Sequence, residues 1–431
     1  MLQLWFVSNM VLWPFSIKIG GITLSLNIIV LMLSGAVWLG KRGRITLCSA
    51  KVLLAFLAYV IFSSILALTG PCNDHLQKLI LTIPILVFFI LIGLEVGRRA
   101  SGSDWSDLQK TAQVVLLVAF SAFIVEKLIP AWFPAQAGYR AEGKLSGLFS
   151  EPSHVAFSLF PCIAVLLAAE DKRMRQKGML ALMGLVVFSR SSTLIALIAA
   201  WAIYRLLVRR KHYRQTALFA LGIASLIAVG AAIDFDRFVT PTVERVVGIA
   251  SPSETENISS LVYVQGWQDA WFNLQRTHGM GLGVNMMGCG TLPDVSARSA
   301  LALAGVELNT EDGSFLFSKV VSETGAGGIA FYVVAIWWWL QLEKKLRHLR
   351  EDGARFAIEM QVVLIFCFVA SSFIRSANYF DGGLLLWVAA VSGASRWKNL
   401  SMQSAGDNIF TSQGGQSAGK PSGGENMFTK I

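Results

Sequence analysis

Long apolar runs separated by short basic clusters constrain the fold of this chain more than any other feature. Runs of 15 to 20 apolar residues recur along nearly the whole of its 431 residues, 54% of which are hydrophobic. A run of that length crosses the hydrocarbon core of a bilayer as one helix. The sequence therefore predicts an all-α polytopic membrane protein. Its net charge of +10 indicates cytoplasmic loops and not a nucleic-acid surface, because the basic residues lie between apolar runs.

The basic clusters predict how the spans are threaded. Five stretches hold twenty Lys and Arg residues and alternate with the apolar runs as cytoplasmic segments do: 41–44, 98–110, 172–177, 205–214 and 344–355. We expect about twelve spans with both termini in the cytoplasm, or eleven if residues 2–17 do not cross. The expected spans are 2–17, 22–40, 51–69, 78–97, 112–129, 153–169, 179–188, 194–208, 216–233, 313–341, 357–374 and 382–396.

Two regions differ from the spans in composition. Residues 234–311 form the longest polar stretch and are expected to be one large loop on the face opposite the basic clusters. Residues 1–399 are expected to form one transmembrane domain, and the Gly- and Ser-rich residues 400–431 a disordered cytoplasmic tail. Within the loop, apolar residues at 3- and 4-residue spacings predict an amphipathic helix lying on the membrane surface: Leu261, Val264, Trp267, Trp271 and Leu274.

The segment 179–208 has basic residues on both flanks, so an even number of crossings is needed within about thirty residues. We expect two short helices hinged at 189–193, since ten apolar residues reach only about 15 Å as a helix. Arg190 would then lie at membrane depth, in a polar cavity or against an anion. The alternative is one tilted helix whose Arg190 reaches back to the membrane surface.

Charged side chains collect on the face opposite the basic clusters. Guanidinium groups hold phosphates bidentately, and neighbouring carboxylates or imidazoles can take a proton from a sugar hydroxyl. These residues suit a phosphate-linked lipid donor, although loops also collect charges without any function. The cations are Arg140, Lys144, Arg190, Arg276 and Arg375, and the acids and imidazoles are Glu142, Glu151, His154, His278, Glu311 and Asp312.

Several motifs have structural explanations. Residues 151–153 are typical of a helix start, with Ser153 a candidate cap and Glu151 favoured by the helix dipole. Residues 279–283 lack the spacing of a nucleotide-binding loop, which leaves a tight turn. Lys319 and Glu323 are four residues apart and are expected to pair.

Two further motifs leave alternatives open. Residues 234–236 have the form of a metal-binding DxD motif, but two acids at the end of a span also fit the membrane interface. Cys72 and Cys289 are the cysteines expected to face an oxidising compartment, and their pairing stays open. We expect no metal and no other cofactor.

Three segments together resemble bacterial O-antigen polymerases and O-antigen ligases (the Wzy and WaaL type, including exopolysaccharide polymerases). Residues 140–154, with Gly-Leu-Phe-Ser-Glu-Pro-Ser at 147–153, resemble a segment that precedes a central span in that family. Ser189-Arg190-Ser191 is similar to the family's Ser-Arg after a short span. The third segment begins at Trp267 and continues through 278–283 to Glu323-Thr-Gly325, which resembles the family's large-loop pattern.

The resemblance implies an inverting, metal-independent glycosyl transfer on the periplasmic face of the bacterial inner membrane. The donor would be a glycan on undecaprenyl pyrophosphate, held by Arg190 and Arg140. It implies as partners the lipid-linked oligosaccharide, the bilayer and a chain-length-regulating co-polymerase, with no nucleic acid.

The chain also departs from the family pattern. Tyr263 stands where an arginine is common, and Glu311-Asp312 stands where the ligases have their histidine. The resemblance therefore favours a repeat-unit polymerase, with Glu311, Asp312 or Glu151 with His154 as the base. The alternatives are a ligase that transfers the glycan to another lipid or protein, and a flippase for lipid-linked oligosaccharide.

Overall fold

The structure is a computed structural model of the chain. It describes residues 1–12, 15–19, 22–42, 45–68, 76–132, 144–208, 240–251, 257–288, 292, 294–305, 313–349, 352–375, 379, 383–384 and 386–393. The described part is almost entirely helical, as the sequence predicted, and its one sheet is a two-stranded antiparallel hairpin. The expected span at 216–233, the DxD motif at 234–236, Cys72, Cys289 and the tail at 400–431 lie outside the described residues.

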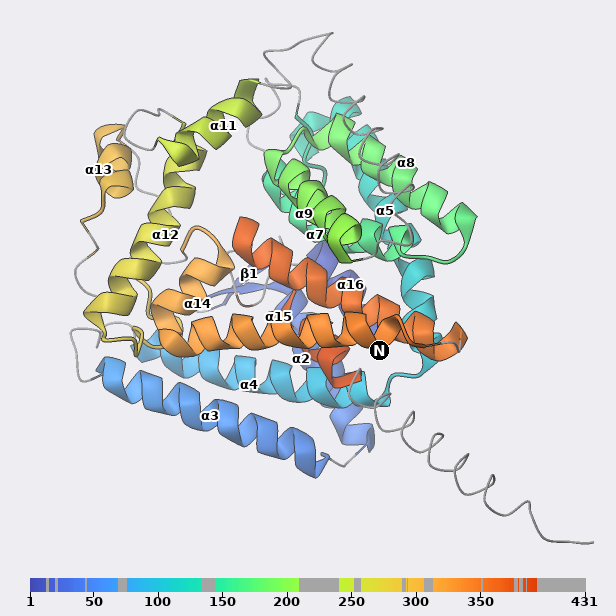
Figure 1. The fold of residues 1–431 in the computed structure, drawn as a ribbon, viewed down its shortest axis with the longest axis horizontal. Coiled ribbons are helices and arrows are strands. Elements are labelled where there is room, and N and C mark those ends of the chain that lie inside the picture. The colour runs from blue at the N-terminus through green and yellow to red at the C-terminus, as the bar shows by residue number, and fades with distance from the viewer. Residues whose placement is uncertain are drawn as a thin grey trace, which may run out of the picture.

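Among the described residues, three helices are long and apolar enough to cross a membrane: Ile80–Arg99, Gly102–Leu128 and Arg355–Ile374. Shorter apolar helices pack beside them (Figure 1). The first part of the chain forms α1 Leu2–Val7, a π-helical segment Ser8–Leu12, β1 Ser16–Ile19, β2 Ile22–Ser25, α2 Leu26–Arg42, α3 Leu47–Leu68, α4 Leu76–Arg99 and α5 Gly102–Leu128. It continues with a 3-10 turn Pro130–Trp132, α7 Pro152–Leu167, α8 Lys172–Ser189, α9 Ser192–Val208 and α11 Thr240–Ala250. The last part comprises α12 Ile258–Arg276, α13 Ser296–Leu303, α14 Leu316–Thr324, α15 Ala326–Leu346 and α16 Asp352–Ile374.

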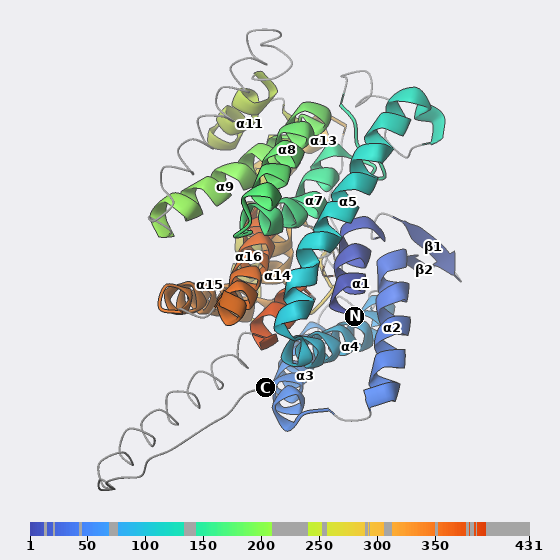
Figure 2. The same cartoon turned by 90° about the vertical axis from the view of Figure 1, so that its right-hand side faces the viewer.

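The antiparallel helices α7 and α16 form the centre of the fold. Ion pairs join them at both ends, because Arg375 Nη2 lies 3.1 Å from Glu151 Oε2 and Arg355 Nε lies 3.9 Å from Glu170 Oε1. The twenty helical residues Arg355–Ile374 reach about 30 Å, the thickness of a hydrocarbon core. Helices α5, α8 and α9 surround α7, which is buried along nearly its whole length (Figure 2).

The end of the α7–α16 pair that contains Arg355 is here called the basic end. Side-chain contacts connect the described parts of the basic stretches to one another there. Arg99 lies over the ring of Trp38, three residues before Lys41, at 5.2 Å from the ring centroid. Lys177 Nζ donates to Gln113 Oε1 at 2.9 Å, and Arg347 donates to the carbonyl oxygen of Val208.

The N-terminal segment is shorter as a helix than the sequence suggested. Helical structure ends at Leu12, and the segment expected to begin a span at residue 22 is strand β2 instead. Met1 shares a pocket with Arg98 and Arg99 at the basic end.

The expectation of one long helix over 313–341 is wrong. Helix α14 ends at Thr324 and α15 begins at Ala326, because Gly325 has φ 58° and ψ −135°, which no helix contains. The segment 279–283 docks onto this break, where Ala326 N donates to the Gly279 carbonyl at 2.8 Å. The sequence around Gly325 does not predict this break, because the contact that stabilises it comes from the distant segment 279–283.

The expected loop helix is present as α12. Trp271 is 62% exposed, whereas Trp267 packs against the rings of Phe315 and Phe317. Its buried face is unexpectedly polar at Gln265, Asp269 and Asn273. Asp269 receives both bonds of an ion pair from Arg298 Nη2, at 2.9 and 2.8 Å, which ties α13 to α12. Burial raises the pKa of Asp269, although Arg298 acts in the opposite direction.

Candidate functional site

A polar cavity of about 280 Å³ lies at the end of α7 and α16 that is opposite the basic end. Helices α7, α9, α11, α12 and α16 contribute to its wall, together with the turn that follows α8. Of the described side chains that line it, four are cations and one is a carboxylate: Lys144, Arg190, Arg245, Arg375 and Glu151. Hydroxyl groups line it as well, from Ser153, Ser191, Ser192, Thr193, Ser259, Tyr263 and Ser314, and the other described lining residues are apolar: Pro152, Ala196, Ile249, Val262 and Ile374. Such a cavity favours an anion that also accepts hydrogen bonds.

Arg190 reaches this cavity because the chain breaks there between α8 and α9. Arg190 is the C-terminal cap of α8 and takes the left-handed conformation, with φ 46° and ψ 38°. The Ser189 hydroxyl donates to the Leu185 carbonyl at 2.8 Å, and Leu145 N donates to the Phe188 carbonyl at 2.9 Å, which fixes the last turn. The expected hinge at 189–193 is confirmed, and the alternative of one continuous tilted helix is wrong. The expectation of a ten-residue helix before the hinge is also wrong, because α8 begins at Lys172 and includes the basic stretch 172–177.

Glu151 and Arg375 form the cavity's ion pair. The Glu151 Oε2 atom accepts from Arg375 Nη2 at 3.1 Å and from the Ser153 hydroxyl at 2.9 Å, and it lies 3.9 Å from His154 Nε2. The Ser150 hydroxyl contacts the other ring nitrogen of His154, Nδ1, at 3.1 Å. These contacts join distant parts of the sequence, since Glu151 and Arg375 are 224 positions apart.

The motif at 151–153 does begin a helix, but not as the sequence suggested. Glu151 is the N-cap of α7 and Pro152 its first residue, so Ser153 is not the cap. Burial alone would raise the pKa of Glu151, but the charges of His154 and Arg375, with hydrogen bonds from Ser153 and Arg375, hold that pKa below its usual range. A carboxylate with a lowered pKa is a weaker proton acceptor, so Glu151 suits the positioning of Arg375 and His154 better than proton abstraction.

Arg245 is a cavity cation that the sequence patterns did not single out. It lies on α11, where its guanidinium donates to the Ser192 hydroxyl and its carbonyl accepts from the Ser260 hydroxyl at 3.0 Å. A signal was present, because Val243, Val246 and Val247 recur at helical spacing and are exposed on α11. The expectation of one polar loop over 234–311 did not include this helix or its arginine.

Other candidate residues lie elsewhere. Arg276 and His278 lie at the exposed C-terminal end of α12 and are not among the residues that line the cavity. Arg276 instead lies over the ring of Phe272, at 5.8 Å from its centroid. Arg140, Glu311 and Asp312 lie outside the described residues. Among the residues that the structure describes, no group of three or more His, Cys, Asp or Glu side chains could hold a metal ion.

The expected pairing of Lys319 with Glu323 is confirmed, at 3.8 Å between Nζ and Oε1 and with both side chains buried. The Glu323 carboxylate also accepts from Asn285 N at 2.6 Å, from Met287 N at 3.3 Å and from the Tyr379 hydroxyl. This cluster lies away from the cavity's lining and holds the 279–288 segment against α14.

Glu151 is expected to make folding depend on pH in the acid range. Its folded pKa is lowered, so its stabilisation is complete above the unfolded value of about 4.3 and is lost as the pH falls through the folded pKa. The Glu151→Gln variant should therefore lose less stability than the wild type when the pH is lowered from about 5 to about 3. Thermal unfolding in detergent measures this. Asp107→Asn, which removes an exposed carboxylate paired with Lys110, is the control, and an equal effect of both substitutions would contradict the assignment.

No protein-family model matches the chain, and no curated protein matches its sequence. Function is therefore inferred from the chemistry of the cavity and from the motifs that line it.

Proposed function

We propose that this chain is a polysaccharide repeat-unit polymerase of a bacterial inner membrane, using a glycan on undecaprenyl pyrophosphate as donor. The observation that carries the proposal is the cavity with four cations, one of them at the break between α8 and α9. A pyrophosphate ester needs such charge compensation while it is bound and when it leaves. The resemblance of residues 140–154, 189–191 and 267–325 to the polymerase and ligase family supports the same chemistry.

The proposed reaction is a single displacement. The acceptor hydroxyl oxygen of an incoming lipid-linked repeat unit attacks the anomeric carbon of the donor glycan, and the bond from that carbon to the pyrophosphate oxygen breaks with inversion. Arg190, Arg245 and Arg375 would stabilise the departing pyrophosphate, which needs no protonation to leave. The proton of the hydroxyl passes to a base, for which His154 beside Glu151 and the loop residues Glu311 and Asp312 are the candidates.

The proposed topology places the basic end in the cytoplasm and the cavity at the periplasmic face. The separation of about 30 Å between the two ion pairs of α7 and α16 supports it, because it equals one hydrocarbon core. Met1 near Arg98 and Arg99 supports a cytoplasmic N-terminus and hence the twelve-span arrangement. A chain-length-regulating co-polymerase is proposed as a partner in this membrane.

Purified protein in liposomes tests the proposal. Without any ion gradient, we expect it to consume lipid-linked repeat units and to form longer lipid-linked glycan, releasing undecaprenyl pyrophosphate. Unchanged donor would contradict the polymerase, and transfer of intact donor across the bilayer would instead identify a flippase.

A deletion strain separates the two enzymes. Loss of a polymerase leaves single repeat units on the final carrier, whereas loss of a ligase leaves long chains on undecaprenyl pyrophosphate.

A further inference from the structure

A second cavity, of about 550 Å³, lies between α3, α4, α14, α15, α16 and the helical residues 386–393. This volume lies within the range of ligand pockets, about 300 to 1,000 Å³, and the cavity is open to the surface along part of its wall. Its lining is almost entirely apolar, with residues such as Phe56, Leu86, Val320, Phe331 and Trp387. None of the described residues lines both this cavity and the cationic one. An apolar void of this size between apolar helices calls for a hydrocarbon occupant.

The cavity has a closed end and an end that carries charge. At the closed end the Tyr59 hydroxyl donates to the Thr324 carbonyl, and a Cβ on Gly327 would lie 1.9 Å from Tyr59 Oη, so α3 contacts the start of α15 there. In Figure 1, α3 slopes away from α15 beyond this contact. One face of α4 follows the cavity from Leu86 to Arg98, a distance of about 18 Å along the helix.

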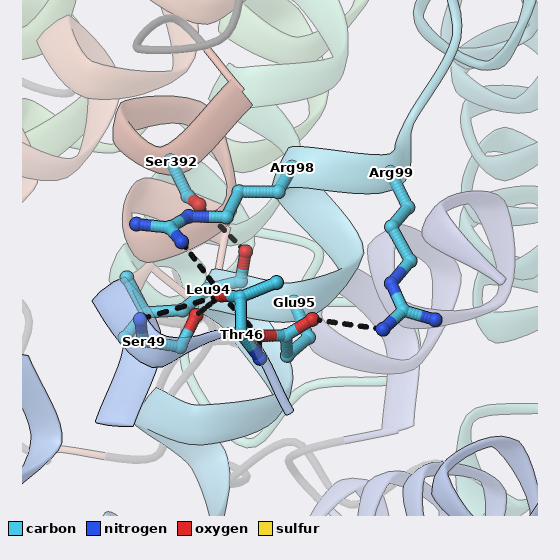
Figure 3. A network of polar contacts seen from close by, with 7 residues as sticks. All are labelled: Thr46, Ser49, Leu94, Glu95, Arg98, Arg99 and Ser392. Carbon is cyan, nitrogen blue, oxygen red and sulfur yellow. Dashed lines mark hydrogen bonds and ion pairs between the residues drawn. The ribbon is translucent and has the colours of Figure 1, made fainter. Parts of the chain in front are cut away.

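Arg98 marks the polar end. Its Nη1 atom donates to the Thr46 hydroxyl at 2.6 Å, while Glu95 accepts from Thr46 N at 2.8 Å and pairs with Arg99 at 3.1 Å (Figure 3). The Ser392 hydroxyl donates to the Leu94 carbonyl at 2.6 Å and holds the last helical segment against α4. Figure 3 shows Arg98 and Arg99 extending to opposite sides of α4. Thr46 therefore links Arg98 to the Glu95 carboxylate, which also pairs with Arg99.

Besides the apolar cavity, Arg98 lines a separate polar space of about 520 Å³, together with Arg99, Trp38 and Asp104. The Asp104 carboxylate accepts from Ser101 N at 2.8 Å and from the Ser101 hydroxyl at 2.7 Å, which employs it as a helix cap. The apolar cavity and the polar space thus meet at an arginine, at the basic end of the molecule. A ligand that suits both has an anionic head and a long hydrocarbon chain.

We propose that this site binds an anionic phospholipid, with one acyl chain in the apolar cavity and the phosphate at Arg98. The cationic cavity lies at the opposite end of α7 and α16, so the proposed glycan donor and this lipid occupy different sites. The inference requires that the chain lies in a membrane, and it does not depend on the polymerase activity. An anionic lipid is preferred to a zwitterionic one because the quaternary amine of phosphatidylcholine would compete with Arg98 for the phosphate.

Native mass spectrometry of the full chain tests the site. The protein is released from nanodiscs that contain equal amounts of phosphatidylglycerol and phosphatidylcholine. We expect one phosphatidylglycerol to be retained per chain. Arg98→Gln should weaken its binding about five- to tenfold and abolish the preference over phosphatidylcholine. Arg173→Gln is the matched control, since Arg173 is exposed in another basic stretch and lines neither cavity.

Filling the cavity gives a second test, with an independent structural basis. Val388→Trp and the smaller change Leu94→Phe both place bulk in the apolar lining, and each should reduce retention of both lipids at unchanged thermal unfolding. Retention that is the same in wild type, Arg98→Gln and the filled variants would overturn the proposal. Displacement of phosphatidylglycerol by undecaprenyl phosphate at equal concentration would also overturn it, since the cavity would then belong to a polyprenyl chain.

Discussion

Replacing Arg190 by alanine is expected to lower polymer formation about 100- to 1,000-fold, the loss seen when one donor to a developing negative charge is removed. Arg190 lines the cationic cavity from the turn between α8 and α9, where the backbone and not a long flexible loop sets its position. The measurements are the ladder of polymer lengths in cells and donor consumption in liposomes. The variant should still insert and fold, because the end of α8 is capped by the backbone N–H of Arg190, which donates to the Val186 carbonyl, and not by the Arg190 side chain.

Two further substitutions at the same position separate catalysis from folding. Arg190 occupies the left-handed region, at φ 46°, which costs a non-glycine residue about 1 kcal/mol. Arg190→Gly removes that cost and one of four neighbouring cations, so it should unfold at the same or a higher temperature while losing activity. Arg190→Lys keeps the charge but not the bidentate fork, and it should retain part of the activity.

Arg276 supplies the matched control. The sequence places Arg276, like Arg190, among the cations on the face opposite the basic clusters. In the structure it lies at the exposed end of α12 and does not line the cavity. Arg276→Ala should change polymer formation by less than about twofold, as expected for an exposed side chain. Full-length polymer from Arg190→Ala, or an equal loss in both alanine variants, would show that the cavity does not hold the pyrophosphate.

The features that the sequence predicted well are those that short segments determine. Apolar runs of sufficient length form helices wherever they pack, so α4, α5 and α16 follow directly from composition. The break at 189–193 was predictable because Ser-Arg-Ser-Ser-Thr interrupts an apolar run whose flanks are both basic. The same local pattern is sufficient to predict that Arg190 lies at a polar turn.

The features that escaped prediction depend on contacts between distant segments. The pairing of Glu151 with Arg375 joins positions 224 apart, and no local pattern selects it over pairing with another cation. Arg245 enters the cavity only because α11 folds back to Ser192, which the polar character of the loop does not reveal. The break at Gly325 belongs to the same class, since it exists where the 279–283 segment docks.

Gly281→Ala is expected to be the most destabilising single-methyl change in the described part of the loop. Gly281 has φ 83°, and a Cβ there would lie 2.4 Å from the Glu323 carbonyl oxygen and 2.5 Å from Gly325 N. The two backbones would have to separate, breaking the bonds from Leu282 N to the Ser322 carbonyl at 2.9 Å and from Gly283 N to the Glu323 carbonyl at 2.8 Å. Strain at φ 83° and two lost bonds together give about 3 to 4 kcal/mol of destabilisation.

Gly279→Ala is the control that isolates the collision from the backbone strain. Gly279 has the same φ of 83°, but its Cβ would approach only the Ala326 side chain, at 3.9 Å. That variant should lose only the strain, about 1 to 2 kcal/mol, and thermal unfolding in detergent should rank it between the wild type and Gly281→Ala. Equal midpoints for the two variants would mean that backbone conformation alone sets the stability of the segment. A much lower midpoint for Gly281→Ala would instead show that close docking on Glu323 holds the break between α14 and α15, and through Tyr379 the chain that follows Arg375.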